Sequence, residues 1–401
     1  MKPWLTVIGV GDGGVATLSP AARRRLDAAT VVFGGARHLA ALGEDGRETI
    51  AWGSPLTQSI KALKDRRGEP VAILASGDPM WFGIGATLSR YIDPAEMEVL
   101  PSPSAFSLAA ARLGWPLQDC LCLSVHGRPL ATLRRSLADG TRLLVLTDDG
   151  AEPARIAALL TEAGFGASRM TVLEHLGGAA ERQRETQASA FDLDGIADLN
   201  LVAVTCGVDD PAGGWGAGPL PDEAFTHDGK MTKRVLRALA LSALAPHPGE
   251  CLWDIGAGSG AISVEWLRAA RAMRAIALEP LAERRAFMAA NAERHGVPEI
   301  EIRSGRAPEA LDGLPTPDAV FIGGGLSQAV FAAAHAALRP GGRLVAHAVT
   351  LESEAILLAL HAEHGGELLR IGVERAEPVG SLHGWKPAMP VIHWHLVKGV
   401  A

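Results

Sequence analysis

The chain has 401 residues, of which 48% are hydrophobic and 21% charged, and its formal net charge at pH 7 is −7. This length exceeds what one hydrophobic core usually supports, so we expect two globular domains. The acidic balance disfavours a nucleic-acid-binding surface, and the composition does not suggest a membrane span. The chain begins without the pattern of a secretory signal peptide, which predicts a cytoplasmic location.

The first half of the chain alternates apolar runs typical of strands with Ala- and Leu-rich stretches typical of helices. Strands are predicted at 5–10, 30–34, 70–75, 97–101, 121–125, 142–147, 170–176 and 199–205. This alternation predicts an α/β domain over residues 1–208. Residues 207–225 are rich in Gly, Pro and Asp without any periodicity, so we expect a linker at 209–220.

The second half, residues 221–401, predicts another α/β domain. An amphipathic helix is expected over 231–246, closed by Pro246. Strands are predicted at 250–256, 274–280, 299–305, 318–324, 341–349, 367–375 and 390–397. Their number indicates a doubly wound, seven-stranded, Rossmann-like sheet whose last pair of strands is antiparallel.

A glycine turn follows the first strand of this second domain, in the sequence LWDIGAGSGAISVEWL. Gly256, Gly258 and Gly260 allow the backbone to approach a ligand closely. The next strand ends in Glu279, whose carboxylate can accept hydrogen bonds from both hydroxyls of a ribose. This pattern fits a dinucleotide or S-adenosylmethionine. Asp254 favours the second, because its charge would offset the cationic methionine part but would repel a pyrophosphate.

The rest of this half carries a more specific resemblance. Asn291 and the segments around 314–325 and 338–349 occupy the usual places in a Rossmann-like methyltransferase. From Leu220 onward, the sequences LPDEAFTHDGKMTKRVLRALALSAL, FIGGG and AVTLESE resemble the decarboxylating methyltransferase domain of corrin biosynthesis. One departure is His347, where that domain leads us to expect asparagine. The resemblance implies S-adenosylmethionine contacts at Asp254, Gly256, Gly258, Gly260, Glu279 and Ala307.

The first half contains ILASGDPMWFGIG, in which a buried strand precedes a tight turn. Together with LPSPSAFSLAAARLGW and LSVHGRP, it resembles the tetrapyrrole methylase family over residues 4–204. In that family two α/β lobes hold S-adenosylmethionine in the cleft between them. The resemblance implies ligand contacts at Gly77, Asp78, Met80, Ser104, Ala105 and Thr147. Gly11 and Gly13, in the opening glycine turn, are expected to face the acceptor.

Two such domains in this order resemble the decarboxylating precorrin methyltransferases of cobalamin biosynthesis. The resemblance implies methylation of a precorrin at meso carbon 5 by the N-terminal domain and at meso carbon 15 by the C-terminal domain. It also implies loss of carbon dioxide from an acetate side chain, which gives precorrin-8. S-adenosylmethionine would bind at two sites, one in each domain. The expected partners are a precorrin-6B-type substrate and further copies of the chain, with no nucleic acid and no membrane.

Methyl transfer to an electron-rich carbon depends mainly on alignment, so neither a nucleophile triad nor a metal is expected. Because the acceptor carries many carboxylates, basic residues should surround each site. The candidates are Arg37, His38, His126 and Arg128 in the first half, and His227, Lys230, Lys233, His347, His383 and Lys386 in the second. The best cluster is SLHGWKPAMPV, because the face of Trp385 beside His and Lys suits a flat anionic macrocycle. Packing of Trp385 in the core is the alternative.

Three other interpretations stay open at this point. A nicotinamide-dependent oxidoreductase would use the same glycine turn and Glu279, although Asp254 lies where the pyrophosphate would come. An RNA methyltransferase is disfavoured by the acidic balance. Finally, one of the two domains would be a non-catalytic binding or assembly module.

Overall fold

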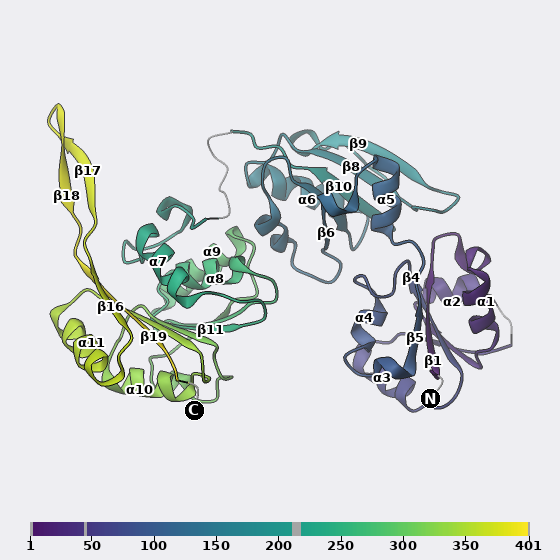
Figure 1. Cartoon of the computed structure of the whole chain (residues 1–401). Coiled ribbons are helices and arrows are strands. Elements are labelled where there is room, and N and C mark those ends of the chain that lie inside the picture. Colours follow the sequence, from purple (N-terminus) through teal and green to yellow (C-terminus); the bar gives the residue numbers. More distant parts are fainter. Residues whose placement is uncertain (1–2, 44–45, 211–217, 400–401) are drawn as a thin grey trace. The chain divides into compact units, whose positions relative to one another are not determined.

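The computed structural model describes residues 3–43, 46–210 and 218–399. The chain divides into two compact units (Figure 1). The N-terminal unit comprises Met1–Leu130 and Ser136–Gly214, and the C-terminal unit comprises Ala131–Arg135 and Trp215–Ala401. Most of the linker expected at 209–220 lies outside the described residues, since 211–217 are not among them. The domain boundaries expected from the sequence therefore stay predictions.

The first lobe of the N-terminal unit is a parallel five-stranded sheet in the order β3-β2-β4-β1-β5. Its strands are β1 (Leu5–Val10), β2 (Val31–Gly34), β3 (Glu48–Ala51), β4 (Val71–Ser76) and β5 (Met97–Leu100), and its α-helices are α1 (Pro20–Asp27), α2 (Ala36–Leu42), α3 (Leu56–Lys64) and α4 (Ile84–Leu88). Leu5 of β1 shares a core with Leu63 of α3, whereas Ile8 shares another with Leu26 of α1. Helices therefore cover both faces of this sheet.

The second lobe of this unit is a mixed sheet in the order β6-β7-β10-β8-β9, in which only β6 and β7 are parallel. Its elements are β6 (Cys120–Ser124), β7 (Arg142–Leu146), β8 (Arg169–Glu174), β9 (Arg182–Gln187), β10 (Asn200–Thr205), α5 (Ala105–Leu113) and α6 (Glu152–Glu162). Phe106 of α5 packs on Leu144 and Leu173 of the sheet. The two lobes together confirm the two-lobed α/β organisation expected for this half.

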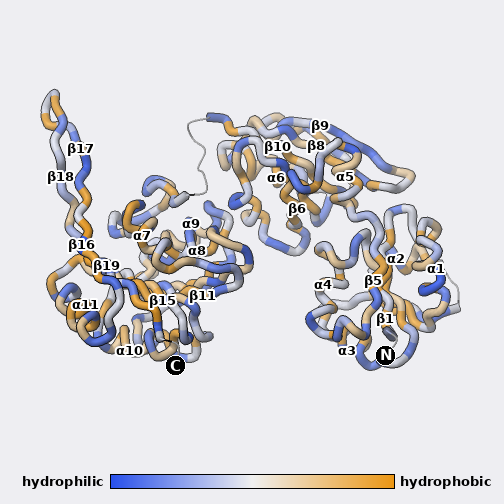
Figure 2. Tube along the Cα trace, viewed as in Figure 1, coloured by the Kyte–Doolittle hydropathy of each residue, from blue (hydrophilic) through white to orange (hydrophobic). Residues whose placement is uncertain are grey.

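All eight strands expected in this half are present, and the sheets add β3 and β9. The sequence does not indicate β9, because RQRETQ has no apolar alternation. Figure 2 shows it as a hydrophilic segment. Hydrogen bonds to β8 place it at the edge of the sheet, where its polar side chains stay in water.

The C-terminal unit confirms the expected doubly wound, seven-stranded sheet, in the order β13-β12-β11-β14-β15-β19-β16. Its strands are β11 (Cys251–Ile255), β12 (Arg274–Leu278), β13 (Glu301–Arg303), β14 (Ala319–Ile322), β15 (Arg343–Ala348), β16 (Glu367–Ile371) and β19 (Val391–Val397). Strand β19 runs antiparallel to both β15 and β16, as expected for the last pair. The helices are α7 (Arg234–Leu244), α8 (Ala261–Ala269), α9 (Ala282–Arg294), α10 (Gln328–Ala337) and α11 (Leu351–His364). Helices α7 and α8 pack into one core, and α10 and α11 pack into a second.

A two-stranded hairpin lies in the chain between β16 and β19, which pair directly with each other in the sheet. Its strands are β17 (Glu374–Val379) and β18 (Leu382–Pro387), which pair only with each other among the described residues. Figure 1 shows the hairpin projecting beyond the sheet. The strand expected at 367–375 is therefore present as β16, but it ends at Ile371, where the chain leaves the sheet. Trp385 is 73% exposed on the hairpin, so it does not pack in the core.

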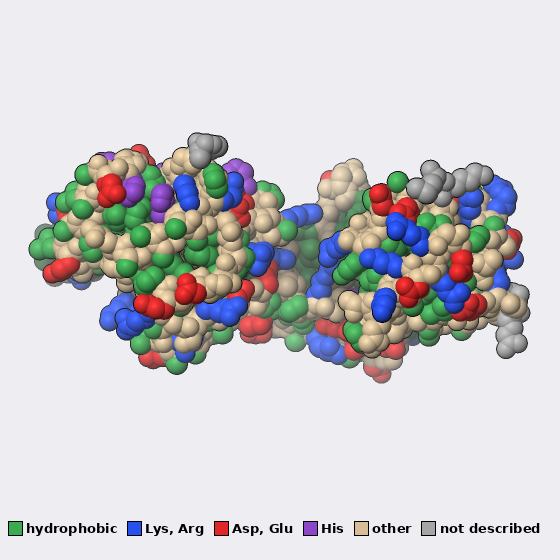
Figure 3. All heavy atoms as spheres, turned by 90° about the horizontal axis from the view of Figure 1, so that it is seen from below, with side chains coloured by type: hydrophobic (Ala, Val, Ile, Leu, Met, Phe, Trp, Pro, Cys, Tyr) green, Lys and Arg blue, Asp and Glu red, His purple; other side chains and the backbone are tan. Residues whose placement is uncertain are grey.

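On the face shown in Figure 3, acidic and basic side chains are interspersed. Among the described residues, no helix combines the length and apolar character needed to cross a membrane.

A buried ion pair joins the start of β15 to the residue before β11, and the same arginine ties β15 to the end of α7. Arg343 Nη1 donates to Glu250 Oε1 at 2.8 Å, and the same guanidinium donates to the carbonyls of Leu244 and Ala245 at the end of α7. Burial alone would raise the pKa of Glu250. The hydrogen bonds and charge of Arg343, with the backbone N–H of His247, outweigh burial and lower this pKa to about 2.

We expect Glu250→Gln to destabilise the C-terminal unit by about 3 kcal/mol at neutral pH, because it leaves the Arg343 guanidinium buried without its carboxylate. The folded-state pKa lies below the usual value of 4.5, so this stabilisation is complete above that value and is lost as the pH falls towards 2. The difference between variant and native chain should therefore shrink over that interval. Hydrogen exchange of β11 and β15 peptides in the full chain measures this difference in stability.

A control is Glu377→Gln, which removes the exposed partner of Lys386 and should change exchange in β11 and β15 little. Equal exchange in the native chain and Glu250→Gln at neutral pH would show that the ion pair does not stabilise the unit.

Candidate functional site

The glycine turn after β11 depends on left-handed backbone. Gly256, Gly258 and Gly260 have φ values of 71°, 58° and 77°. A Cβ atom on Gly256 would lie 2.7 Å from the carbonyl oxygen of Gly324, and one on Gly260 would lie 2.4 Å from Cγ of Met288. Glycine is therefore required for both the conformation and the close approach. The turn lies directly against the FIGGG segment that follows β14.

Glu279 stands at the end of β12, beside this turn. Its side chain is buried, with Oε2 accepting from the backbone N–H of Gly258 and Oε1 from that of Leu281, both at 3.0 Å. These two bonds fix the direction of the carboxylate. Because each carboxylate oxygen can accept more than one hydrogen bond, capacity remains for hydroxyl donors of a ligand.

Asp254 lies beneath the turn, near the end of β11, and is 1% exposed. Its Oδ2 accepts from the N–H of Ser263 at 3.2 Å and from its hydroxyl at 2.7 Å, whereas Oδ1 has no partner within the described part of the chain. Burial raises the pKa of Asp254 to about 6. The hydroxyl of Ser259, in the turn itself, is also buried without a partner there. Buried polar groups of this kind call for a further partner.

A loop before α7 adjoins the same turn. The Asn291 carboxamide accepts from the N–H of Thr226 at 2.8 Å and donates to the carbonyl of Ser259 at 2.9 Å. It thereby joins the loop to the turn. His227, Lys230 and Lys233 of the basic candidates lie on this loop or at its junction with α7. Ala307 follows β13 and packs partly buried against the core beside α10 and α11.

The structure corrects the other basic candidates of this unit. His347 is buried, and its Nε2 lies 2.9 Å from Nδ1 of His393. Burial lowers the pKa of His347 to about 3, so the ring is neutral near pH 7 and does not provide a cation for carboxylates. His383 and Lys386 lie on the projecting hairpin, where Lys386 pairs with Glu377 at 2.8 Å. The structure does not bring them to the glycine turn.

The N-terminal unit contains a cavity of about 600 Å³ with walls from both of its lobes. Its lining includes five of the six expected ligand contacts, namely Gly77, Asp78, Ser104, Ala105 and Thr147. Met80 is not in the lining, and its side chain is 46% exposed. The volume lies in the range of small-molecule sites. The sequence thus placed most of these residues correctly around one space, and their contact with a ligand stays a prediction.

Local geometry explains why these loops meet. Gly77 has φ 53°, and a Cβ atom there would lie 3.1 Å from Cα of Ser104. Ser104 begins α5 by accepting from the N–H of Ser107 at 3.1 Å. The Thr147 hydroxyl donates to Oδ1 of Asn200 at 2.7 Å. The loop after β4 therefore meets the start of α5 at the cavity, and the end of β7 adds a further part of the lining.

The four basic candidates of this half all line the cavity. His38 is neutral near pH 7, because burial and the nearby Arg37 lower its pKa to about 4, and its Nε2 lies 2.9 Å from the Ser76 hydroxyl. It therefore does not serve as the cation expected from the sequence. Gly11 lines the cavity as expected, whereas Gly13 does not.

An aromatic ledge beside the cavity is a feature that the sequence analysis missed. Trp81 and Phe82 are 39% and 42% exposed, and their rings lie 5.3 and 5.9 Å from that of Phe106. The guanidinium of Arg128 lies 4.8 Å from the centre of the Phe82 ring. Phe82 has φ 56°, a strained conformation for a residue with a side chain. The adjacent aromatic pair after GDPM was the available sequence signal.

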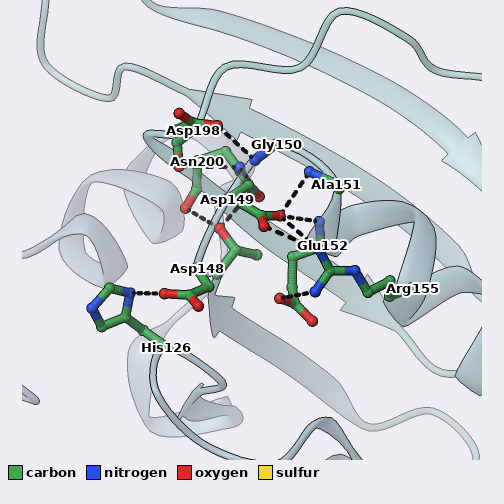
Figure 4. Close-up of polar contacts among 10 residues, drawn as sticks. His126, Asp148, Asp149, Gly150, Ala151, Glu152, Arg155, Asp198 and Asn200 are labelled. Carbon is green, nitrogen blue, oxygen red and sulfur yellow. Dashed lines mark hydrogen bonds and ion pairs between the residues drawn. The ribbon is translucent and has the colours of Figure 1, made fainter.

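A second missed feature is the acidic loop after β7. Figure 4 shows the Asp148 carboxylate facing the His126 ring, and Oδ1 of Asp148 lies 2.7 Å from Nδ1 of His126. The neighbouring Asp149 accepts from the N–H groups of Ala151 and Glu152 at the start of α6. The sequence gives no spacing signal for this pair, because β6 and β7 are brought together only by the fold.

Two family models match the chain. The model described as tetrapyrrole (corrin/porphyrin) methylases matches residues 4–192, and the precorrin methyltransferase domain matches residues 223–398. The precorrin-6Y C(5,15)-methyltransferase [decarboxylating] of Sinorhizobium sp is 52% identical over 100% of this chain and 97% of that protein. The chain belongs to the precorrin-6Y C(5,15)-methyltransferase family. Apart from Ala131–Arg135, which group with the C-terminal unit, the two matched segments of this family member fall one in each compact unit.

Shorter proteins resemble parts of the chain. The cobalt-precorrin-7 C(5)-methyltransferase of Salmonella typhimurium is 31% identical over 50% of this chain and 98% of that protein. The cobalt-precorrin-6B C(15)-methyltransferase (decarboxylating) of the same organism is 35% identical over 43% of this chain and 92% of that protein. The activities that name this family therefore also occur in the names of separate, shorter proteins.

Proposed function

We propose that the chain methylates a precorrin at meso carbons 5 and 15 with S-adenosylmethionine and removes carbon dioxide from an acetate side chain, giving precorrin-8 in cobalamin biosynthesis. The observation that carries this proposal is the match over the whole chain with a relative named for both methylations and the decarboxylation. We assign carbon 5 to the N-terminal unit and carbon 15 with the decarboxylation to the C-terminal unit, as the resemblance of each half implies; shorter relatives named for each activity support a division between two domains.

In the C-terminal unit, the glycine turn is the proposed S-adenosylmethionine site. The Glu279 carboxylate is held beside the turn and can accept from the ribose hydroxyls. Asp254 places negative charge beneath it, which favours a sulfonium ligand. Bound S-adenosylmethionine supplies the electrophilic methyl group. Lys230 and Lys233, on the adjoining loop, are the proposed partners of acceptor carboxylates.

Decarboxylation requires few further groups from the protein. The conjugated ring can take up the electron pair of the breaking C–C bond, so the chain has to hold the acetate carboxylate out of the ring plane. The residue that orients this carboxylate lies, in our proposal, on the loop that carries Lys230 and Lys233, because Asn291 fixes this loop against the glycine turn.

In the N-terminal unit, the cavity is the proposed second S-adenosylmethionine site, with Gly77, Ser104 and Ala105 among the contacts. The aromatic ledge offers a face on which a flat macrocycle can stack. Arg128 on the ledge can pair with a carboxylate of the acceptor through its planar guanidinium. The relatives' names do not favour the nicotinamide and RNA alternatives.

We expect the full chain to bind two equivalents of S-adenosylhomocysteine in calorimetric titration. Glu279→Ala should leave one equivalent, because it removes the carboxylate beside the glycine turn. Ala105→Trp should also leave one, because the new ring fills the cavity of the N-terminal unit.

The double variant should then bind none, and Glu283→Ala, on the first turn of α9, serves as the control that keeps both sites. A native chain that binds a single equivalent would contradict the two-site proposal. A chain that binds none would contradict the methyltransferase proposal itself.

We also propose that the chain associates with further copies of itself through the β17–β18 hairpin. Val379, Leu382 and Trp385 of the hairpin are 65%, 73% and 73% exposed, and Met389 next to it is 68% exposed. Such clustering of large apolar side chains on a projecting element favours a protein contact. The cytoplasmic location expected from the sequence stays a prediction.

Trp385→Ser should shift the chain towards smaller species in sedimentation velocity, because truncating a buried aromatic anchor commonly costs about 2 kcal/mol or more of association energy. Leu358→Ser, a change at a similarly apolar exposed residue of α11, should leave the distribution as it is. A native chain that sediments as a monomer would refute self-association.

A further inference from the structure

Methylation at carbon 5 releases a proton, and this inference rests on the proposed function. A methine bridge carbon carries one hydrogen. When it attacks the sulfonium methyl group, the S–CH₃ bond breaks with its electron pair left on sulfur, and a C–CH₃ bond forms. The carbon then bears both substituents until the C–H bond breaks and its electron pair returns to the ring. The N-terminal site therefore needs a proton acceptor near the methylated carbon.

The cavity offers few candidates among its titratable lining residues, which are Asp12, Arg37, His38, Asp78, His126, Arg128 and Asp198. The arginines stay protonated and cannot accept. The carboxylate of Asp12 already contacts Arg37 at 3.4 Å and His175 at 3.1 Å. These two partners hold it away from a role as base.

The remaining carboxylates and His38 are also engaged. Asp78 Oδ1 accepts from the N–H of Met80 at 2.9 Å, and Asp198 Oδ1 accepts from that of Gly150 at 3.1 Å. Asp78 is therefore engaged within its own loop, and Asp198 holds the loop after β7. His38 contacts Ser76 and is a weak base in its buried position. This leaves His126.

The fold gives His126 the partner that a general base needs. Strands β6 and β7 are parallel neighbours, with Ser124 opposite Leu146, so the residues after them lie at the same edge of the sheet. There Asp148 lies 2.7 Å from Nδ1 of the ring (Figure 4). A carboxylate on this nitrogen holds the proton there and leaves the lone pair of Nε2 available.

Neighbouring groups place this ring near the acceptor. Arg128, two residues further, stacks on Phe82 of the aromatic ledge, and both residues line the cavity with His126. Asp149, next to Asp148, fixes the loop by accepting from the first N–H groups of α6. The His126 ring therefore lines the same cavity as the proposed stacking face, and its partner Asp148 lies on an anchored loop.

We propose that His126 is the catalytic residue that accepts the proton from carbon 5 through Nε2, and that Asp148 is a positioning residue that orients its ring. The side chains of His126 and Asp148 are 69% and 51% exposed. An ordinary surface ion pair would have similar exposure. The test must therefore report on proton transfer and not on the ion pair alone.

The experiment uses the full-length chain with its precorrin substrate and S-adenosylmethionine, and follows both products by mass spectrometry. In His126→Ala, methylation at carbon 5 should slow about 100-fold, while methylation and decarboxylation at carbon 15 continue. Added imidazole should restore part of the lost rate. A substrate with deuterium on carbon 5 should show a larger primary isotope effect in the variant than in the native enzyme, because proton removal then limits the rate.

Asp148→Asn should reduce kcat for the carbon 5 step with little change in KM, and should shift the pH dependence of that step. The matched control is His247→Asn in the C-terminal unit, whose side chain is also 69% exposed and lies 3.7 Å from a carboxylate, that of Glu250. It should leave both methylations at the native rate.

The outcomes separate the two proposals. If the native enzyme methylates carbon 15 but never carbon 5, the proposed function of the N-terminal unit is wrong. If the native enzyme methylates both carbons and His126→Ala keeps carbon 5 methylation within about threefold of the native rate, the role of His126 is refuted. A large rate loss without imidazole rescue and without the isotope effect refutes it as well, since that result indicates a structural role.

Discussion

Parallel strands deliver their carboxyl ends to one edge of a sheet, and both candidate sites depend on this constraint. In the C-terminal unit the ends of β11, β12 and β14 bring the glycine turn, Glu279 and Gly324 together. In the N-terminal unit the ends of β1 and β4 provide Gly11 and Gly77, and the ends of β6 and β7 provide the opposite wall. Residues far apart in the sequence therefore share one space without any sequence motif that joins them.

The two units form their candidate ligand sites in different ways. In the C-terminal unit a single turn with three left-handed glycines approaches a second glycine segment, so the site is formed largely by main chain. In the N-terminal unit several loops from two lobes surround a cavity, and side chains such as those of the aromatic ledge shape it. A side chain on Gly256 or Gly260 would disturb the first site, and one on Gly77 would disturb the second, because all three have left-handed backbone and a close neighbour.

The sequence predicted most of the fold, because periodic apolar runs mark buried strands. It missed β9, whose polar residues pair only at a sheet edge, and the hairpin, whose apolar residues face solvent. Residue type and local motif were enough to place Gly77 and Glu279. They could not show that His347 is buried beside His393, or that His126 meets Asp148, because each of these contacts depends on which strands pair in the sheet.

Burial also decides which basic residues can recognise an anionic acceptor. A histidine inside the fold loses its charge, because desolvation disfavours the cation, as it does for His38 and His347. A guanidinium keeps its charge in the same surroundings and offers a planar fork to a carboxylate. On a chain with net charge −7, attraction of a polycarboxylate therefore depends on arginines and lysines at the rim, such as Arg128, while the proposed proton acceptor is the exposed His126. Charge recognition and base chemistry thus fall to different side chains of the same cavity.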